Sequence, residues 1–198
     1  MSDPDTKGDA WTLPPSRYAA TRAVEFRQPK VPLSSYVTMR DGCRIAVDVW
    51  LPEGAAPGAR FPTVMILTPY YRRFKLVEGG SGDEIPKAGK CVRYLVPRGY
   101  AVMVVDIRGT GASFGTRDAF RSPREREDSR ELADWVVAQA WSNGRIGATG
   151  ISYPGAASDF LASTGHPAVK AIAPLFAVWD TYADNYYPGG ILLKQLAT

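Results

Sequence analysis

Histidine and cysteine are scarce in this sequence of 198 residues, which contains one histidine and two cysteines. Cys43 and Cys91 lie far apart, and neither belongs to a Cys-x-x-Cys or Cys/His cluster of the kind that binds zinc. The sequence therefore implies no metal site. We expect the two cysteines to be buried free thiols rather than the halves of a disulfide.

Long apolar segments and long basic runs are also missing. Residues 1–10 hold no apolar stretch of the kind that forms a secretory signal, and no stretch approaches the roughly 20 apolar residues of a membrane span. The formal net charge is +4, but the basic residues are scattered between apolar segments. These absences argue against nucleic acid and membrane as partners, and they favour a cytoplasmic location.

The remaining composition is that of an ordinary globular protein, with 45% hydrophobic and 22% charged residues. The length suits one domain with a sizeable core. Residues 1–33 are rich in proline, arginine and small polar residues and show no sustained periodicity, so we expect an irregular N-terminal arm. The core pattern runs over residues 34–175.

Strand-like and helix-like segments alternate along this core. In chain order, we expect a hairpin of strands at 35–40 and 44–51, buried strands at 63–68 and 101–106, helices at 87–96 and 122–140, a strand ending at 150, a helix to about 164 and a last strand at 169–175. Asp41-Gly42 supplies the hairpin turn, and Ser122 with Glu125 supplies a capping box. A long loop follows the strand at 63–68. The alternation predicts an α/β fold with a mostly parallel, doubly wound sheet.

The most informative stretch is Gly150-Ile-Ser152-Tyr153-Pro154-Gly155. A strand-like run, a serine and a helix-like run follow one another there, which is the sequence form of a nucleophile elbow. Glycines suit its flanks because the tight turn brings strand and helix together, and proline is tolerated in the first helical turn. The strict pattern G-x-S-x-G is not met, since the closing glycine stands three residues after the serine.

A literal G-x-S-x-G occurs elsewhere, at Gly111-Ala-Ser113-Phe-Gly115. It lies in a glycine-rich loop after the strand at 101–106, and no helical pattern begins at Ser113. The same loop differs by one residue from a dinucleotide-binding fingerprint, and it lacks the helix that should open at once. We therefore favour Ser152 over Ser113, and the sequence implies no cofactor.

Several motifs occur in order and at plausible spacing: Asp106-Ile-Arg108-Gly109, Trp141-Ser-Asn143-Gly144, the stretch around Ser152, and Lys170-Ala-Ile-Ala-Pro174. Together they resemble the cocaine esterase/X-Pro dipeptidyl-peptidase branch of the α/β-hydrolases, the CocE/NonD hydrolases. The resemblance runs from about Ser34 to the end of the chain. The elbow of this family, G-x-S-Y-x-G, also carries its second glycine three residues after the serine.

The resemblance implies an α/β-hydrolase fold and a role for three residues. Ser152 would be the acyl-accepting nucleophile, the backbone N–H of Tyr153 one oxyanion donor, and the hydroxyl of Tyr70 the other, with Tyr71 as the alternative in register. Members of the family continue into strands with a catalytic acid and histidine, a helical cap and a jelly-roll domain. We therefore expect the fold to be C-terminally incomplete and residues 176–198 to begin the cap.

The polar residues near the motifs have simpler interpretations. His166 follows the helix that Ser152 begins, about 20 Å away, so it does not serve as the catalytic base, and we expect a surface histidine in a turn. Asp180 and Asp184 are expected to be loop carboxylates rather than the catalytic acid. Asp106 and Arg108 are expected to hold their loop together by turn bonds and an ion pair.

The sequence leaves two questions open. Five aromatic residues near the C-terminal end either line an acyl pocket or pack in the core or cap: Phe176, Trp179, Tyr182, Tyr186 and Tyr187. The sequence also leaves open whether the protein forms a homo-oligomer.

The predicted function is that of a serine hydrolase. It would cleave ester or amide bonds, X-Pro dipeptidyl bonds among them, through an acyl-enzyme on Ser152, with a small-molecule ester, amide or peptide as substrate. The alternatives are a non-catalytic remnant or binding scaffold that keeps the elbow without a triad, and an acyltransferase.

Overall fold

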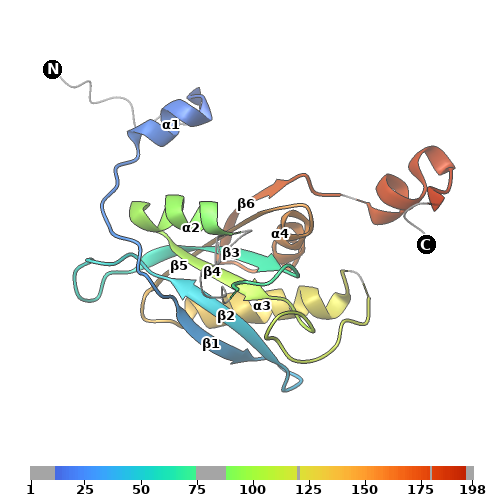
Figure 1. Cartoon of the computed structure of the whole chain (residues 1–198), viewed down its shortest axis with the longest axis horizontal. Helices are drawn as coiled ribbons and strands as arrows, with labels where there is room; N and C mark the ends of the chain where they lie inside the picture. Colours follow the sequence, from blue (N-terminus) through green and yellow to red (C-terminus); the bar gives the residue numbers. More distant parts are fainter. Residues whose placement is uncertain (1–11, 75–87, 120, 179, 195–198) are drawn as a thin grey trace, which may run out of the picture.

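The computed structural model describes residues 12–74, 88–119, 121–178 and 180–194. Most of the loop predicted after the strand at 63–68 falls outside these ranges, as does Trp179. The described residues form a six-stranded sheet in the order β1-β2-β4-β3-β5-β6 (Figure 1). The strands are β1 Leu33–Thr38, β2 Arg44–Trp50, β3 Phe61–Thr68, β4 Ala101–Asp106, β5 Ser142–Ile151 and β6 Val169–Leu175.

The sheet is mixed in the way that the sequence predicts. β1 and β2 form an antiparallel hairpin, and β2 also runs antiparallel to β4. The pairs β3–β4, β3–β5 and β5–β6 are parallel. The carboxyl ends of these parallel strands therefore meet at one edge of the sheet, the edge at which open α/β sheets bind ligands.

Helices cover both faces of the sheet. They are α2 Gly89–Leu95, extended by a short 3-10 helix η2 Val96–Arg98, α3 Pro123–Val137 and α4 Tyr153–Ser163. Figure 1 shows α2 and α3 on opposite sides of the sheet. Successive residues of β4 serve the two faces, because Met103 and Val105 pack with α3 and α4 while Val102 and Val104 pack with α2. This two-sided burial explains the continuous apolar run and confirms the doubly wound sheet.

The N-terminal arm is not irregular throughout. Residues Pro15–Thr21 form a short helix, α1, which stands away from the sheet in Figure 1. Pro15 occupies the first helical position, where its fixed φ is favourable, and alanines follow. Local propensity thus produces a helical turn where the absence of periodicity predicted none.

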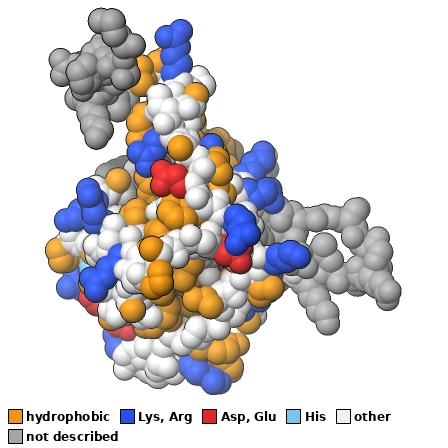
Figure 2. All heavy atoms as spheres, turned by 90° about the vertical axis from the view of Figure 1, so that its left-hand side faces the viewer, with side chains coloured by type: hydrophobic (Ala, Val, Ile, Leu, Met, Phe, Trp, Pro, Cys, Tyr) orange, Lys and Arg blue, Asp and Glu red, His pale blue; other side chains and the backbone are white. Residues whose placement is uncertain are grey.

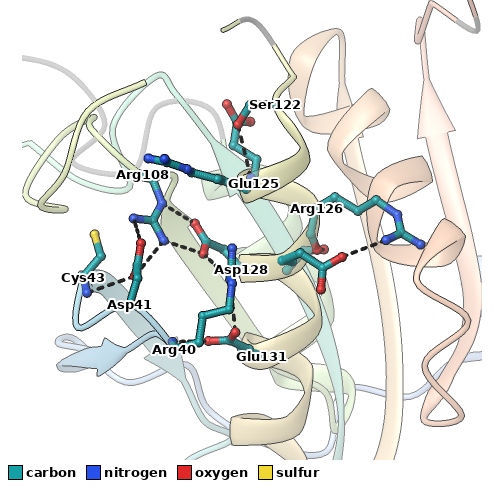
Figure 3. Close-up of polar contacts among 12 residues, drawn as sticks. Arg40, Asp41, Cys43, Arg108, Ser122, Glu125, Arg126, Asp128 and Glu131 are labelled. Carbon is teal, nitrogen blue, oxygen red and sulfur yellow. Dashed lines mark hydrogen bonds and ion pairs between the residues drawn. The ribbon is translucent and has the colours of Figure 1, made fainter. Parts of the chain in front are cut away.

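Arg108 joins three segments that are distant in sequence (Figure 3). Its guanidinium donates to Asp128 of α3, with Nε to Oδ2 at 2.8 Å and Nη2 to Oδ1 at 2.7 Å. It also donates from Nη1 to Asp41 Oδ2, at 2.7 Å, in the hairpin turn. The hydrogen bonds to Asp128 raise the pKa of Arg108 above its ordinary value. The predicted structural role of Arg108 is confirmed.

The expectation of a surface histidine is wrong. His166 is 7% exposed. Its Nδ1 accepts a hydrogen bond from the Ala168 N–H at 3.1 Å, so Nε2 carries the proton and donates to Asp134 Oδ1 at 2.9 Å. The turn after α4 folds back on α3, and the ring fills the space between them. This contact joins positions too far apart in sequence for a local pattern to reveal.

Both cysteines are free, as predicted, but each is only partly buried. Cys43 lies in the hairpin turn, where its thiol approaches the Phe114 carbonyl oxygen at 3.2 Å. Burial raises the pKa of both thiols. Neither is therefore set up as a reactive thiolate.

The last described segment lies apart from the sheet. β6 is an edge strand with largely exposed side chains, and Phe176 directly after it is 89% exposed. The chain then forms a π-helix, η3 Thr181–Tyr186, and a short 3-10 helix, η4 Pro188–Gly190, drawn in red in Figure 1. Tyr182 stacks on Tyr187 with ring centroids 4.5 Å apart. Two of the C-terminal aromatic residues thus pack on one another.

The surface agrees with the scattered charge of the sequence. On the face in Figure 2, lysine and arginine side chains stand apart from one another with hydrophobic side chains between them, and they form no continuous stripe. None of the helices in the described ranges is both long enough and apolar enough to cross a membrane.

Candidate active site

Ser152 stands at a sharp turn between β5 and α4. Its backbone has a positive φ of 63° with ψ −120°, a combination outside the usual allowed regions that a residue other than glycine rarely adopts. Such strain persists only where the surrounding structure over-determines it, and it is common at functional sites. The predicted strand–turn–helix geometry is confirmed, and the Ser152 hydroxyl makes no capping hydrogen bond to α4.

The glycines on either side of the serine are required by close contacts. A Cβ on Gly150 would overlap Pro154, and a Cβ on Gly155 would lie 2.7 Å from the Leu175 carbonyl oxygen. Neither glycine has a positive φ. Their role is therefore to let β5, α4 and β6 approach one another, as the elbow interpretation predicts.

Hydrogen bonds hold the turn to the neighbouring strand and helix. The Ser152 N–H donates to the Leu175 carbonyl oxygen at 2.9 Å, and the Ser152 carbonyl accepts from the Ala156 N–H at 3.0 Å. The serine side chain is exposed. Tyr153, the first residue of α4, places its N–H at a helix N-terminus, where the helix dipole favours developing negative charge.

Tyr70 lies at the same edge of the sheet as Ser152. It follows the carboxyl end of β3, which pairs in parallel with β5, so the two residues come after adjacent strands. The Tyr70 N–H donates to Thr68 Oγ1 at 2.9 Å, and the side chain is 39% exposed. Tyr71 has a left-handed backbone with φ 66°, which bends the loop directly after Tyr70.

An arginine that sequence reasoning missed anchors this loop. Arg72 donates from Nη1 to Asp106 Oδ2 at 2.6 Å, and its Nε lies 3.1 Å from Asp48 Oδ1. Both carboxylates are 1% exposed, and the Arg72 N–H also donates to Asp106, at 2.6 Å. A sequence signal existed, because Asp48 interrupts an otherwise apolar buried strand, and a buried charge requires a partner.

The hydroxyl of the alternative serine, Ser113, is used in two hydrogen bonds to the backbone. Ser113 Oγ donates to the Asp106 carbonyl oxygen at 2.6 Å and accepts from the Ala46 N–H at 2.8 Å. It lies in the loop after β4, and the next helix, α3, begins only at Pro123. Its hydroxyl thus ties the loop to β2 and β4, and Ser113 has none of the elbow geometry.

The side chain of Tyr153 is as constrained as its backbone. The residue is 4% exposed, and its phenol donates to the carboxylate of Glu125. Arg117 Nη2 donates to the phenol oxygen at 3.0 Å. The sequence identified Glu125 only as part of a capping box. The Ser122 half of that box is present, since Ser122 Oγ accepts from the Glu125 N–H.

The strand order and the turn at Ser152 together define the class of protein. A mostly parallel sheet with the serine at a strained, positive-φ turn between β5 and α4 is the α/β-hydrolase fold. A sequence profile of the X-Pro dipeptidyl-peptidase family (S15) matches residues 41–198. The chain belongs to this family, in agreement with the resemblance drawn from its motifs.

Relatives with known names support the assignment. A Mycobacterium bovis protein named as a serine esterase is 44% identical over 165 residues, covering 80% of this chain and 26% of that protein. The cocaine esterase of a Rhodococcus species is 33% identical over 159 residues, covering 79% of this chain and 25% of the esterase. A solved CocE/NonD family hydrolase from Staphylococcus aureus superposes with a TM-score of 0.70 and 27% identity, covering 88% of this chain and 34% of that chain. The chain thus spans about a quarter of the length of these curated relatives.

Proposed function

We propose that this chain carries the nucleophile and oxyanion donors of a serine hydrolase that cleaves esters or amides. The observation that carries the proposal is the strained, positive-φ backbone of Ser152 between β5 and α4, with an exposed side chain whose hydroxyl makes no capping hydrogen bond. Capping serines have extended backbones and bond to the helix. Ser152 does neither, and membership of a hydrolase family supports a chemical role.

The proposed reaction begins with attack of Ser152 Oγ on the acyl carbonyl carbon. The carbonyl oxygen becomes an oxyanion, which accepts hydrogen bonds from the Tyr153 N–H and the Tyr70 hydroxyl. The bond to the alcohol or amine then breaks, leaving an acyl ester on Ser152. Water attacks this ester, releases the acid and restores the serine.

The proton of Ser152 needs an acceptor, and His166 does not fit this role. It stands after the C-terminal end of α4, while Ser152 stands before the N-terminal end. Its Nε2 also carries the proton donated to Asp134. We propose that the acid and base of the whole enzyme belong to the part of the fold that its longer relatives share beyond this segment.

The names of the relatives support a substrate class for the whole protein. The relatives are named as serine esterase, cocaine esterase and Xaa-Pro dipeptidyl-peptidase. Small-molecule esters, amides and short peptides are the substrates that we propose for the whole protein. Ester and peptide substrates share the acyl-enzyme on Ser152, so the nucleophile can be tested without choosing between them.

The test is labelling by a fluorophosphonate probe, with added imidazole as an external base. The wild-type chain should label slowly, and imidazole should accelerate labelling, because the one histidine of the sequence, His166, lies beyond the far end of α4 from the serine. Ser152→Ala should abolish labelling, and Ser113→Ala is the matched control that should keep it. Labelling of Ser152→Ala at the wild-type rate would contradict the assignment, and the absence of any Ser152-dependent labelling would favour a binding scaffold.

A further inference from the structure

Backbone strain such as that at Ser152 persists only where the surrounding structure holds it in place. The backbone contacts to Leu175 and Ala156 fix the serine itself. The next residue, Tyr153, carries the proposed oxyanion donor, so its position decides whether that N–H points at the reacting carbonyl. Tyr153 extends its side chain away from the turn, into the space between α4 and the N-terminal end of α3.

At the far end of that side chain lies a buried polar cluster, formed by Tyr153, Glu125 and Arg117. The Tyr153 phenol donates to Glu125 Oε2, while Arg117 Nη2 donates to the phenol oxygen at 3.0 Å. Arg117 Nε also lies 3.5 Å from Glu125 Oε1. The Glu125 side chain is 6% exposed and that of Arg117 is 29% exposed. The phenol is therefore held between a carboxylate and a guanidinium.

The helix that carries Glu125 is also held in place. Glu125 belongs to the first turn of α3, whose N-terminus is capped by Ser122. One turn later, Asp128 is bound by Arg108, which also reaches the hairpin turn (Figure 3). The start of α3 is thus a rigid support. Because the Glu125 carboxylate is part of this helix turn, it can position the Tyr153 phenol that donates to it.

The electrostatics favour the phenol as donor. Burial raises the pKa of Tyr153, and the hydrogen bond to Glu125 raises it further, so the hydroxyl keeps its proton. Burial also raises the pKa of Glu125, an effect opposed by the hydrogen bond from Tyr153 and the nearby charge of Arg117. The carboxylate thus depends on these two partners for its charge. A hydrogen bond to a charged acceptor in a buried site is stronger than one between neutral groups.

Resting on the serine hydrolase function proposed above, we propose that Glu125 is a positioning residue for the nucleophile elbow. It acts through the Tyr153 phenol and holds the backbone of Tyr153, and with it Ser152, in the reactive geometry. Glu125 itself touches neither the substrate nor the serine. This role is separate from the capping box, in which Ser122 Oγ accepts from the Glu125 N–H and the Glu125 carboxylate accepts from the Ser122 N–H, because the cap does not involve the Tyr153 phenol.

The test is a double-variant cycle on the saturating rate of fluorophosphonate labelling in imidazole. Glu125→Gln and Tyr153→Phe should each lower this rate about tenfold, and the double variant should lose about tenfold rather than a hundredfold, because each change removes the same charge-assisted hydrogen bond. The half-saturating probe concentration should not change. Glu127→Gln is the matched control, since this residue lies on the same helix, has a side chain that is 44% exposed and pairs with Arg126.

A second readout does not depend on reactivity. The Ser152 N–H bonds to Leu175, so its hydrogen exchange reports opening of the elbow. Exchange should rise about tenfold in each single variant and no further in the double variant, while Glu127→Gln leaves it unchanged. Both readouts require that the variants keep the wild-type circular dichroism spectrum. Glu125→Gln and Tyr153→Phe preserve side-chain size for this reason.

The outcomes separate the two proposals. Labelling that is no faster in the wild type than in Ser152→Ala would refute the serine hydrolase function, and the exchange cycle would still decide the role of Glu125. A Glu125→Gln variant with wild-type labelling and exchange would overturn the positioning role. Multiplicative losses in the double variant would also overturn it, because they would show that Glu125 acts independently of the phenol.

Discussion

The Ser152 N–H and the Leu175 carbonyl oxygen are joined by a 2.9 Å hydrogen bond. This bond links the turn that presents the serine to the end of the last parallel strand, β6. A Cβ on Gly155 would stand 2.7 Å from the same oxygen, so α4 approaches β6 as closely as a glycine permits. The geometry of the serine therefore depends on the packing of β5, α4 and β6 against one another.

Gly155→Ala should disrupt this packing. Its methyl group would meet two backbone oxygens, of Leu175 at 2.7 Å and of Gly150 at 3.0 Å, which cannot move as a side chain can. We expect a loss of about 1–3 kcal/mol in the free energy of unfolding, measured in urea, together with slower labelling of Ser152.

The control for this variant is Gly147→Ala in β5. A Cβ there would lie 3.4 Å from the Ala171 carbonyl oxygen, an ordinary contact distance. This change should be neutral or stabilising by up to about 1 kcal/mol, because alanine costs less backbone entropy than glycine within a strand. Equal stability of the two variants would show that the close approach at Gly155 is unimportant.

Arg72→Met should destabilise the fold. It would leave the buried carboxylates of Asp48 and Asp106 without their shared partner. We expect a loss of about 3 kcal/mol, the low end for a broken buried ion pair, because Arg73 stays 3.1 Å from Asp48. The exposed Arg27 pairs with Glu53 at 3.7 Å, so Arg27→Met should cost less than about 1 kcal/mol. Similar losses in the two variants would contradict the anchoring role of Arg72.

The hairpin turn should make stability depend on pH. The hydrogen bond from Arg108, with that from the Cys43 N–H, lowers the pKa of Asp41 to about 2. The ordinary aspartate pKa is about 3.9, so the stabilisation is fully present above that value and is lost as the pH falls from about 4 to about 2. The difference in urea midpoint between the wild type and Asp41→Asn should therefore shrink across this window. A constant difference would contradict the assignment.

Tyr70→Phe tests the second oxyanion donor. Removing one such donor typically lowers the rate by about 10²–10³, so imidazole-supported labelling of Ser152 should slow by that factor while the urea midpoint changes little. Tyr71→Phe is the matched control one residue away and should keep the wild-type rate. The reverse result would move the donor to Tyr71, and wild-type rates in both variants would exclude a tyrosine donor on this loop.

The parts of the molecule that local sequence determines were predictable. Gly150, Ser152 and Gly155 lie within one short stretch, and their residue types follow from the geometry of a single turn. The alternation of apolar strands and amphipathic helices predicted the sheet, because each of these segments also shows its pattern within a short stretch of sequence. The family resemblance, rather than any local pattern, supplied the roles of Tyr70 and Tyr153.

The contacts that were missed connect distant segments. His166 is buried because its ring reaches Asp134 on α3, and Arg72 is anchored because Asp48 and Asp106 end up on adjacent strands. The bond from Tyr153 to Glu125 spans two helices in the same way. Each of these depends on the tertiary arrangement, although a charged residue in an apolar strand, such as Asp48, signals that a partner must exist.

The central claim is that Ser152 is the nucleophile, and mass spectrometry of the fluorophosphonate adduct tests it most directly. Trypsin releases Ser152 within residues 146–170 and Ser113 within residues 109–117, so the two candidates fall in separate peptides. Fragmentation should place the phosphonyl group on Ser152, with peptide 109–117 unmodified. An adduct on Ser113, or on Ser158 or Ser163 in the Ser152 peptide, would contradict the assignment.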